Sequence, residues 1–268
     1  MVKHILACRI GSYRDFTLYS YEHLSKIEVE YIERPLPSSD KEVEMIQDIL
    51  DEFNLKISSF QAKFTPLNSD KFENQINEAI KYAKIFDTSI LFSSIKVPEN
   101  PVEKAISSLG KRKWDKMYEK LHYLGEKLGE NGLKVCLETH PNLVTNGKIG
   151  LETMQSVNQE NVCINFDTAN MYYYNEGIDA VEELKLIKDY VGSVHLKDSN
   201  KKPKTWYFPA LGDGNVDFPA IISVLDEIGF KGPYTMEIEG IEGEKLNLEQ
   251  TKERIKRSVE YMRSIGDF

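Results

Sequence analysis

Short runs of β-branched and apolar residues alternate with longer stretches of helical spacing along this 268-residue chain, and the alternation repeats eight times. The predicted strands span residues 4–9, 27–33, 55–61, 88–95, 134–139, 162–167, 191–196 and 233–239. No two strands follow one another directly, which favours a parallel sheet connected by helices. Eight strand-and-helix units in roughly 250 residues predict an α/β fold, a closed (β/α)8 TIM barrel.

An open, doubly wound sheet is the competing architecture. Such a sheet usually carries a Gly-rich phosphate loop after its first strand, and the segment RIGSYRDF at this place has no GxGxxG pattern. Helices are predicted over 112–131, where Gly132 follows as a stop signal, from Asp217 onward, and over 247–265. Because no linker, low-complexity tract or tandem repeat divides the chain, we expect one barrel domain over residues 1–268.

Composition narrows the class of partner. The net charge of -9 argues against binding to nucleic acid, whose phosphates are neutralised by lysine and arginine. No apolar stretch approaches the roughly 20 residues of a membrane helix, and the first residues have too short an apolar core for a signal peptide. Cys8, Cys136 and Cys163 lie in apolar segments and are expected to be reduced and buried. We therefore expect a cytoplasmic protein with a small polar ligand and no membrane partner.

The run GSVHLKD, residues 192–198, shows where the chemistry lies. Alternate residues of a strand face opposite sides, so the apolar Val194 and Leu196 face the helices while His195 and Lys197 face the barrel interior. The same parity in the neighbouring strands selects four inward residues near the C-terminal strand ends, where barrel active sites are built: Glu138, Asp167, His195 and Glu237.

Three carboxylates in one confined mouth repel one another unless a cation neutralises them. With one imidazole they form an oxygen-rich ligand set that suits Mn²⁺ best, with Mg²⁺, Co²⁺ or Zn²⁺ as alternatives, and they leave coordination positions open for a substrate. Taken singly, each acidic residue is more often a helix cap, a loop ligand or a solvated charge. The joint pattern on four consecutive strands favours the metal site.

The segments LETHPN, NFDTAN, SVHLKD and MEIEG resemble those of the sugar-phosphate isomerase/epimerase superfamily, the xylose isomerase-like TIM barrels. This group includes ketose 3-epimerases, hydroxypyruvate isomerases and inosose dehydratases, and more distantly apurinic-site endonucleases. The resemblance implies that Glu138, Asp167, His195 and Glu237 are the metal ligands. It also implies that Glu138 and Glu237 are catalytic and transfer protons on opposite sides of a bound sugar.

Some positions depart from this family pattern. Ketose 3-epimerases commonly carry a histidine where this chain has Asn170, and an arginine where it offers Lys201, Lys202 and Lys204. Substrate contacts of the epimerase type are therefore not implied. The endonucleases need a histidine-rich cluster of three metals, and the five histidines of this chain do not supply one at the mouth.

Four further residues are candidates for binding the substrate, and each has a structural alternative. His140 follows Glu138 by two residues and is equally typical of a loop histidine. Asn170 is also a routine turn former, and Lys197, which could hold an anion, is also placed to pair with Asp198 or Glu239. Trp206 opens an aromatic run in the long loop after residue 196 and indicates either a substrate cover or a subunit contact.

The ends of the first three strands complete the predicted mouth. Arg9, Glu33, Gln61 and Lys63 lie there and are expected to shape the pocket. The reading that follows is a divalent-metal-dependent isomerase or epimerase of a keto-sugar, acting through a metal-stabilised enediolate. A dehydratase acting on a keto-polyol such as an inosose is the nearest alternative, and a non-catalytic sugar-binding barrel the next. A homo-oligomer is consistent with the family.

Overall fold

The first and last strands of the barrel pair with each other and close a ring of parallel strands. In this computed structural model, which describes residues 3–98 and 107–268, β1 pairs with β9 in the register Ile5 to Pro233 and Cys8 to Met236. The barrel order is β1-β2-β3-β4-β5-β6-β7-β9, so the predicted (β/α)8 barrel is confirmed. The strands are β1 (Ile5–Arg9), β2 (Tyr31–Pro35), β3 (Lys56–Gln61), β4 (Ile90–Ser93), β5 (Lys134–Glu138), β6 (Val162–Asp167), β7 (Val191–Leu196) and β9 (Pro233–Met236).

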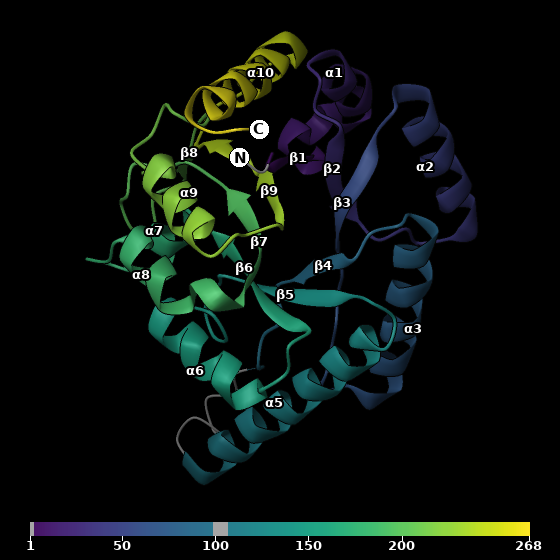
Figure 1. The fold of residues 1–268 in the computed structure, drawn as a ribbon, viewed down its shortest axis with the longest axis vertical. Coiled ribbons are helices and arrows are strands. Elements are labelled where there is room, and N and C mark those ends of the chain that lie inside the picture. Colours follow the sequence, from purple (N-terminus) through teal and green to yellow (C-terminus); the bar gives the residue numbers. More distant parts are fainter. Residues whose placement is uncertain (1–2, 99–106) are drawn as a thin grey trace.

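Helices surround the strands on the outside of the ring (Figure 1). They are α1 (Ser20–Lys26), α2 (Asp40–Phe53), α3 (Ser69–Ile85), α5 (Ser107–Gly129), α6 (Gly147–Val157), α7 (Asn170–Tyr174), α8 (Ala180–Ile187), α9 (Phe218–Glu227) and α10 (Leu248–Ile265), with 3-10 segments η1 (Ile10–Tyr19) and η2 (Lys188–Tyr190). The main apolar core lies between these helices and the strands, where Leu121 and Leu124 of α5 are fully buried. Among the described helices, none has the length and apolar character needed to cross a membrane.

The residues predicted to begin or end helices are found at helix ends in the structure. Gly132 follows α5 with a φ of 72°, a left-handed conformation that glycine adopts at little cost. Asp217 caps α9, because its side chain accepts a hydrogen bond from the Ala220 amide, and Asn247 forms a capping box with Gln250 at the start of α10.

The predicted strand 27–33 is wrong at its start, since β2 begins only at Tyr31. The preceding residues finish α1. The Ile27 amide donates to the His23 carbonyl, the Val29 amide donates to the Leu24 carbonyl, and Glu28 between them has a φ of 59°. The β-branched residues of this segment therefore belong to a helix end.

The loop after β7 contributes one strand of a small antiparallel pair that is separate from the barrel sheet. This pair joins β8 (Tyr207–Phe208) to β10 (Gly240–Ile241), which follows β9 after three residues. Of the predicted strand 233–239, only residues 233–236 therefore form a barrel strand. The Glu237 amide nevertheless donates a hydrogen bond to the Leu196 carbonyl at 2.9 Å. That hydrogen bond keeps Glu237 beside the end of β7.

Candidate metal centre

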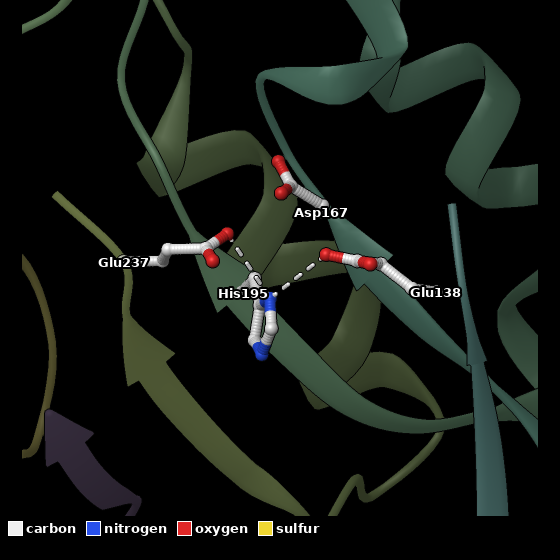
Figure 2. A group of neighbouring side chains, drawn as sticks. All are labelled: Glu138, Asp167, His195 and Glu237. Atoms are coloured by element: carbon white, nitrogen blue, oxygen red, sulfur yellow. Dashed lines mark ion pairs between the residues drawn. The ribbon is translucent and has the colours of Figure 1, made fainter. Parts of the chain in front are cut away.

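Four acidic and imidazole side chains meet where β5, β6, β7 and β9 end. Glu138 and Asp167 are the last residues of β5 and β6, His195 lies one residue before the end of β7, and Glu237 directly follows β9. Figure 2 shows His195 between the two glutamates, with Asp167 beside them. Each residue offers one ligand atom, and these atoms lie within 4.8 Å of one another. The structure thus brings together all four residues that strand parity selects.

The buried polar atoms of this cluster fit a cation. The buried His195 Nδ1 has no hydrogen-bond partner, although such atoms in folded proteins nearly always have one, and the buried Asp167 Oδ2 and Glu237 Oε2 each lie 2.8 Å from the Lys197 ammonium. The imidazole Nδ1 lies 3.3 Å from Glu237 Oε2 and 3.5 Å from Glu138 Oε1. Lone pairs from three carboxylates and one imidazole therefore point at one region, a donor set that suits a divalent ion with open positions.

Local structure orients the aspartate. Its Oδ1 accepts hydrogen bonds from the amides of Ala169 and Asn170 at 3.0 and 2.9 Å, at the first turn of α7. Because one oxygen is held by these amides, the other oxygen is directed into the cluster. The cap-like role expected of a lone aspartate is therefore taken by Oδ1 of Asp167, and Oδ2 is the oxygen available to a metal ion.

Lys197 supplies positive charge to the cluster. Its Nζ lies 2.8 Å from Asp167 Oδ2, 2.8 Å from Glu237 Oε2 and 3.0 Å from Glu239 Oε2. Burial raises the pKa of Asp167 to about 7, against the opposite effect of Lys197. Burial lowers the pKa of Lys197, but the carboxylates of Asp167 and Glu237 outweigh it and hold that pKa well above its usual range.

The remaining cluster residues are shifted by the same balance. Burial raises the pKa of Glu237, but Lys197 and His195 outweigh it and hold the pKa well below its usual range. Burial likewise raises the pKa of Glu138, and its contact with His195 leaves that pKa lowered overall. For His195 burial lowers the pKa, and the carboxylates of Glu33 and Glu237 raise it well above its usual range. The cluster is therefore a network of mutually dependent charges.

The second oxygen of each glutamate is held by a different kind of donor. The Arg9 guanidinium donates to Glu237 Oε1, and the Ser94 hydroxyl donates to Glu138 Oε2. Arg9 also donates to Gln61 Oε1 at 3.1 Å, and its guanidinium lies over the Phe92 ring at 5.3 Å from the ring centre. Both glutamates thus have one oxygen directed into the cluster and one fixed outside it.

The other predicted site residues lie at different distances from the cluster. Asn170 Oδ1 accepts from Lys197 Nζ at 3.3 Å, so this side chain does border the cluster. His140 is half-buried, and its Nε2 is 2.9 Å from the Tyr174 hydroxyl. Trp206 is 38% exposed and packs against Phe208, whose ring lies 5.2 Å from Lys197 Nζ.

Sequence reasoning missed some residues and left others open. Ser94 contacts Glu138 and Tyr174 contacts His140, but neither belongs to a recognisable sequence motif. The one available signal was the position of Ser94 near the end of the predicted strand 88–95. Of the two ion pairs predicted as alternatives for Lys197, the one with Glu239 is present. Asp198 instead accepts hydrogen bonds from backbone amides. Lys63 is exposed, and within residues 3–98 and 107–268 it forms no hydrogen bond or ion pair with the four clustered residues.

The sequence matches the model of the xylose isomerase-like TIM barrel family over residues 21–265. The chain belongs to this family. The match spans most of the barrel, including all four strands that carry the clustered side chains. The family membership that the four sequence segments suggested is thereby confirmed.

Relatives of this xylose isomerase-like barrel include enzymes of two kinds. The chain is 27% identical over 223 residues to an inosose dehydratase of Clostridium perfringens (strain 13 / Type A), covering 74% of both chains. It is 28% identical over 118 residues to an L-ribulose 3-epimerase of Methylomonas sp. (strain DH-1), covering 42% of this chain and 38% of the epimerase. These relatives support an enzyme of sugar or polyol chemistry at the level of the family.

Solved structures show the same fold. A D-allulose 3-epimerase from Methylomonas sp., crystallised with D-allulose, superposes with a TM-score of 0.74 at 19% identity and covers 98% of each chain. The IOLI protein, crystallised with a bound zinc atom, also gives a TM-score of 0.74 at 19% identity, with full coverage of both chains. At this identity the similarity establishes the barrel architecture.

Proposed function

We propose that this protein is a divalent-metal-dependent isomerase or epimerase that moves a proton at the carbon beside the carbonyl of a keto-sugar or a related keto-polyol. The observation that carries the proposal is the pair of glutamates on either side of His195, each with one oxygen in the cluster and the other held outside it. Two carboxylates placed in this way can exchange protons with a substrate held between them.

The proposed ligands of the ion are Glu138, Asp167, His195 and Glu237. Manganese suits this ligand set best, and the zinc in a structural relative makes Zn²⁺ the first alternative to test. A bound divalent ion would supply Lewis-acid polarisation of the carbonyl and the neighbouring hydroxyl of the substrate, which makes the adjacent C–H bond more acidic.

Glu138 is the better candidate for removing the proton. The outer oxygen of Glu237 is held by the positive charge of Arg9, and a second cation, Lys197, lies 2.8 Å from its inner oxygen. Both cations favour the ionised carboxylate and weaken its attraction for a proton. The outer oxygen of Glu138 is held by the neutral Ser94 hydroxyl, so Glu138 is the stronger base.

Polar groups around the cluster would orient the substrate. Lys197, directly after β7, and Asn170, the first residue of α7, border the cluster. His140, two residues after Glu138, is hydrogen-bonded to Tyr174, the last residue of α7. These groups offer donors and acceptors for hydroxyl oxygens of a sugar. Trp206 is proposed as an apolar cover at the edge of the site, because it packs on the Phe208 ring that faces Lys197.

A dehydratase is the second candidate. It is favoured by the similarity to inosose dehydratases over 74% of the chain, which exceeds the coverage of the epimerase. The first step is the same, namely removal of a proton beside the carbonyl, after which a hydroxyl on the next carbon leaves as water. Lys197, whose ammonium lies 2.8 Å from Asp167 Oδ2, is a cationic group of the cluster that can donate a proton to that hydroxyl.

Incubation of the manganese-loaded protein with keto-sugars and keto-polyols in deuterated water tests both candidates. Deuterium at the carbon beside the carbonyl is expected for an active substrate, and mass spectrometry then separates the two reactions, because dehydration removes a water and epimerisation does not. Glu176→Gln, which changes an exposed glutamate, is the control and is expected to incorporate deuterium as the wild type does. Absence of carbon-bound deuterium with every substrate of the panel would contradict the proposal.

A further inference from the structure

Glu33 is a carboxylate buried on the opposite wall of the barrel from the candidate metal centre. It lies in β2 and is 1% exposed. Across the interior, its two oxygens lie 3.1 and 3.2 Å from His195 Nε2. A buried carboxylate is costly unless hydrogen-bonded or paired, and this contact pairs Glu33 with the imidazole, with the hydrogen bond made to Oε2.

The neighbouring strands hold Glu33 in place. Ser59 of β3 is its register partner, and the Ser59 hydroxyl donates to Glu33 Oε2 at 2.7 Å. On the other side, Arg9 of β1 is also a register partner, with Nε 4.0 Å from Glu33 Oε1. A hydroxyl and a guanidinium in one layer of the barrel thus fix the position from which Glu33 reaches His195.

The two nitrogens of His195 have separate surroundings. Nε2 faces Glu33, whereas Nδ1 faces Glu138 and Glu237 and has no hydrogen-bond partner. A histidine that ligates a metal must be neutral, with one N–H and one lone pair, and a carboxylate at Nε2 then holds the N–H there. The lone pair is then left on Nδ1, the nitrogen that faces the cluster. The Phe92 ring, 4.7 Å from the imidazole at an interplanar angle of 74°, restricts the remaining rotation of the ring.

We propose that Glu33 is a positioning residue that fixes the tautomer and the orientation of His195 so that Nδ1 is presented to a divalent ion. This inference rests on the proposed metal centre and adds to it a residue from the N-terminal part of the barrel, outside the four ligands. Partners of this kind typically change metal affinity about 10- to 100-fold when removed. Glu33 touches no substrate in this account and acts only through His195.

Zinc binding and histidine NMR test the inference without reference to activity. In the ¹⁵N-histidine-labelled, zinc-loaded wild type, we expect His195 to show a protonated Nε2 and a metal-bound Nδ1. In Glu33→Ala, zinc affinity measured by chelator competition is expected to fall about 10- to 100-fold, and the Nε2–H signal to be lost to exchange with water. Glu33→Gln keeps an acceptor oxygen and is expected to restore part of both.

Two further variants separate positioning from general damage. Ser59→Ala removes only the hydroxyl that holds Glu33 and is expected to give a smaller loss of zinc affinity than Glu33→Ala. Glu42→Gln is the matched control, because Glu42 pairs with Arg34, which follows Glu33 in β2. This variant is expected to leave zinc affinity and the His195 signals unchanged. If Glu33→Ala does not fold, Glu33→Gln and Ser59→Ala decide the question.

The outcomes distinguish this inference from the proposed function. Wild-type affinity and an unchanged Nε2–H signal in folded Glu33 variants would overturn the positioning role while leaving the metal centre intact. A wild-type protein whose His195 signals do not respond to zinc would overturn the metal centre itself, and the positioning role with it.

Discussion

The two glutamates of the cluster are chemically unequal although their positions look symmetrical. Arg9 and Lys197 surround Glu237 with positive charge, whereas Ser94 gives Glu138 a neutral partner. A carboxylate held by two cations is a poor proton acceptor. Under the proposed function, the difference favours Glu138 as the residue that removes the proton and Glu237 as the residue that holds charge on the opposite side of the site.

Replacement of Glu138 by glutamine is therefore expected to slow proton exchange at the substrate carbon by about 100- to 10,000-fold, the usual contribution of a general base. Glu237→Gln is expected to slow it less at saturating metal. Deuterium incorporation measured by NMR at matched metal content gives both values. A larger loss in Glu237→Gln would transfer the role of base to that residue.

Lys197 is the ion-pair partner of the fully buried Asp167 and adds to the positive charge around Glu237, so its removal leaves the Asp167 carboxylate without that partner when no ion is bound. For metal-free Lys197→Met we expect the free energy of unfolding in urea to fall by about 3–5 kcal/mol, with a large part restored by manganese. The exposed Lys202→Met variant is the control. Equal stability of the metal-free wild type and Lys197→Met would show that the lysine does not balance the cluster.

Among the elements, the long loop after β7 is ordered by one aspartate. Asp198 Oδ1 accepts from the Val216 amide, and Oδ2 accepts from the amides of Gly212 and Gly214 at 2.9 and 2.8 Å. A Cβ on Gly214 would lie 2.2 Å from Asp198 Oδ1, so glycine is required where the loop closes on the carboxylate. Asp198 thus ties this loop, which carries Trp206, to the end of the strand that carries His195.

Asp198→Asn presents an amide group to two of these backbone donors and leaves them without an acceptor. We expect faster hydrogen exchange at residues 212–216 and a loss of about 1–3 kcal/mol in the free energy of unfolding. The control is Asp217→Asn at the start of α9, since asparagine caps a helix as well as aspartate does. Unchanged exchange in Asp198→Asn would show that the loop is held by other contacts.

Helix α1 contains a half-buried histidine that makes stability depend on pH. Burial, assisted by the nearby charge of Lys252, lowers the pKa of His23 below its ordinary value of 6.5, and its Nδ1 lies 2.6 Å from the Tyr13 hydroxyl. Below pH 6.5 the unfolded chain takes up a proton that the folded protein resists, so stability is lost as the pH falls. Glu249 acts in the opposite sense on the same group.

We expect His23→Gln to weaken the fall in the unfolding midpoint between pH 7 and a pH below 6.5, measured by urea denaturation. His122→Gln, at a side chain 42% exposed on α5, is the control and should follow the wild type. A wild-type slope in His23→Gln would contradict the role given to burial at this position.

Strand parity recovered the site because it depends only on local geometry. Glu138, Asp167 and His195 alternate with apolar neighbours, and any inward strand residue near the C-terminal end must reach the mouth. Ser94 could not be found in this way, because its contact with Glu138 depends on how β4 and β5 sit side by side. Ile27 misled the strand prediction because a β-branched residue at a helix end has the same local signature as a strand.

In the molecule as a whole, the two parts of the barrel contribute differently to the centre. The proposed ligands come from β5, β6, β7 and the end of β9, whereas Arg9, Glu33 and Ser59, which support them, come from β1, β2 and β3. Closure of the ring by β1 and β9 brings these parts together, and the His4 amide donates to the Asp267 carbonyl where the chain ends meet. The centre is thus assembled only by the closed barrel, so its full set of contacts was beyond a reading of separate segments.

X-ray diffraction from crystals soaked in manganese, recorded for the anomalous signal of the metal, tests the central claim directly. One peak is expected inside the mouth, bound by an atom each from Glu138, Asp167, His195 Nδ1 and Glu237. A peak elsewhere, or the four side chains without a peak between them at saturating manganese, would contradict the account.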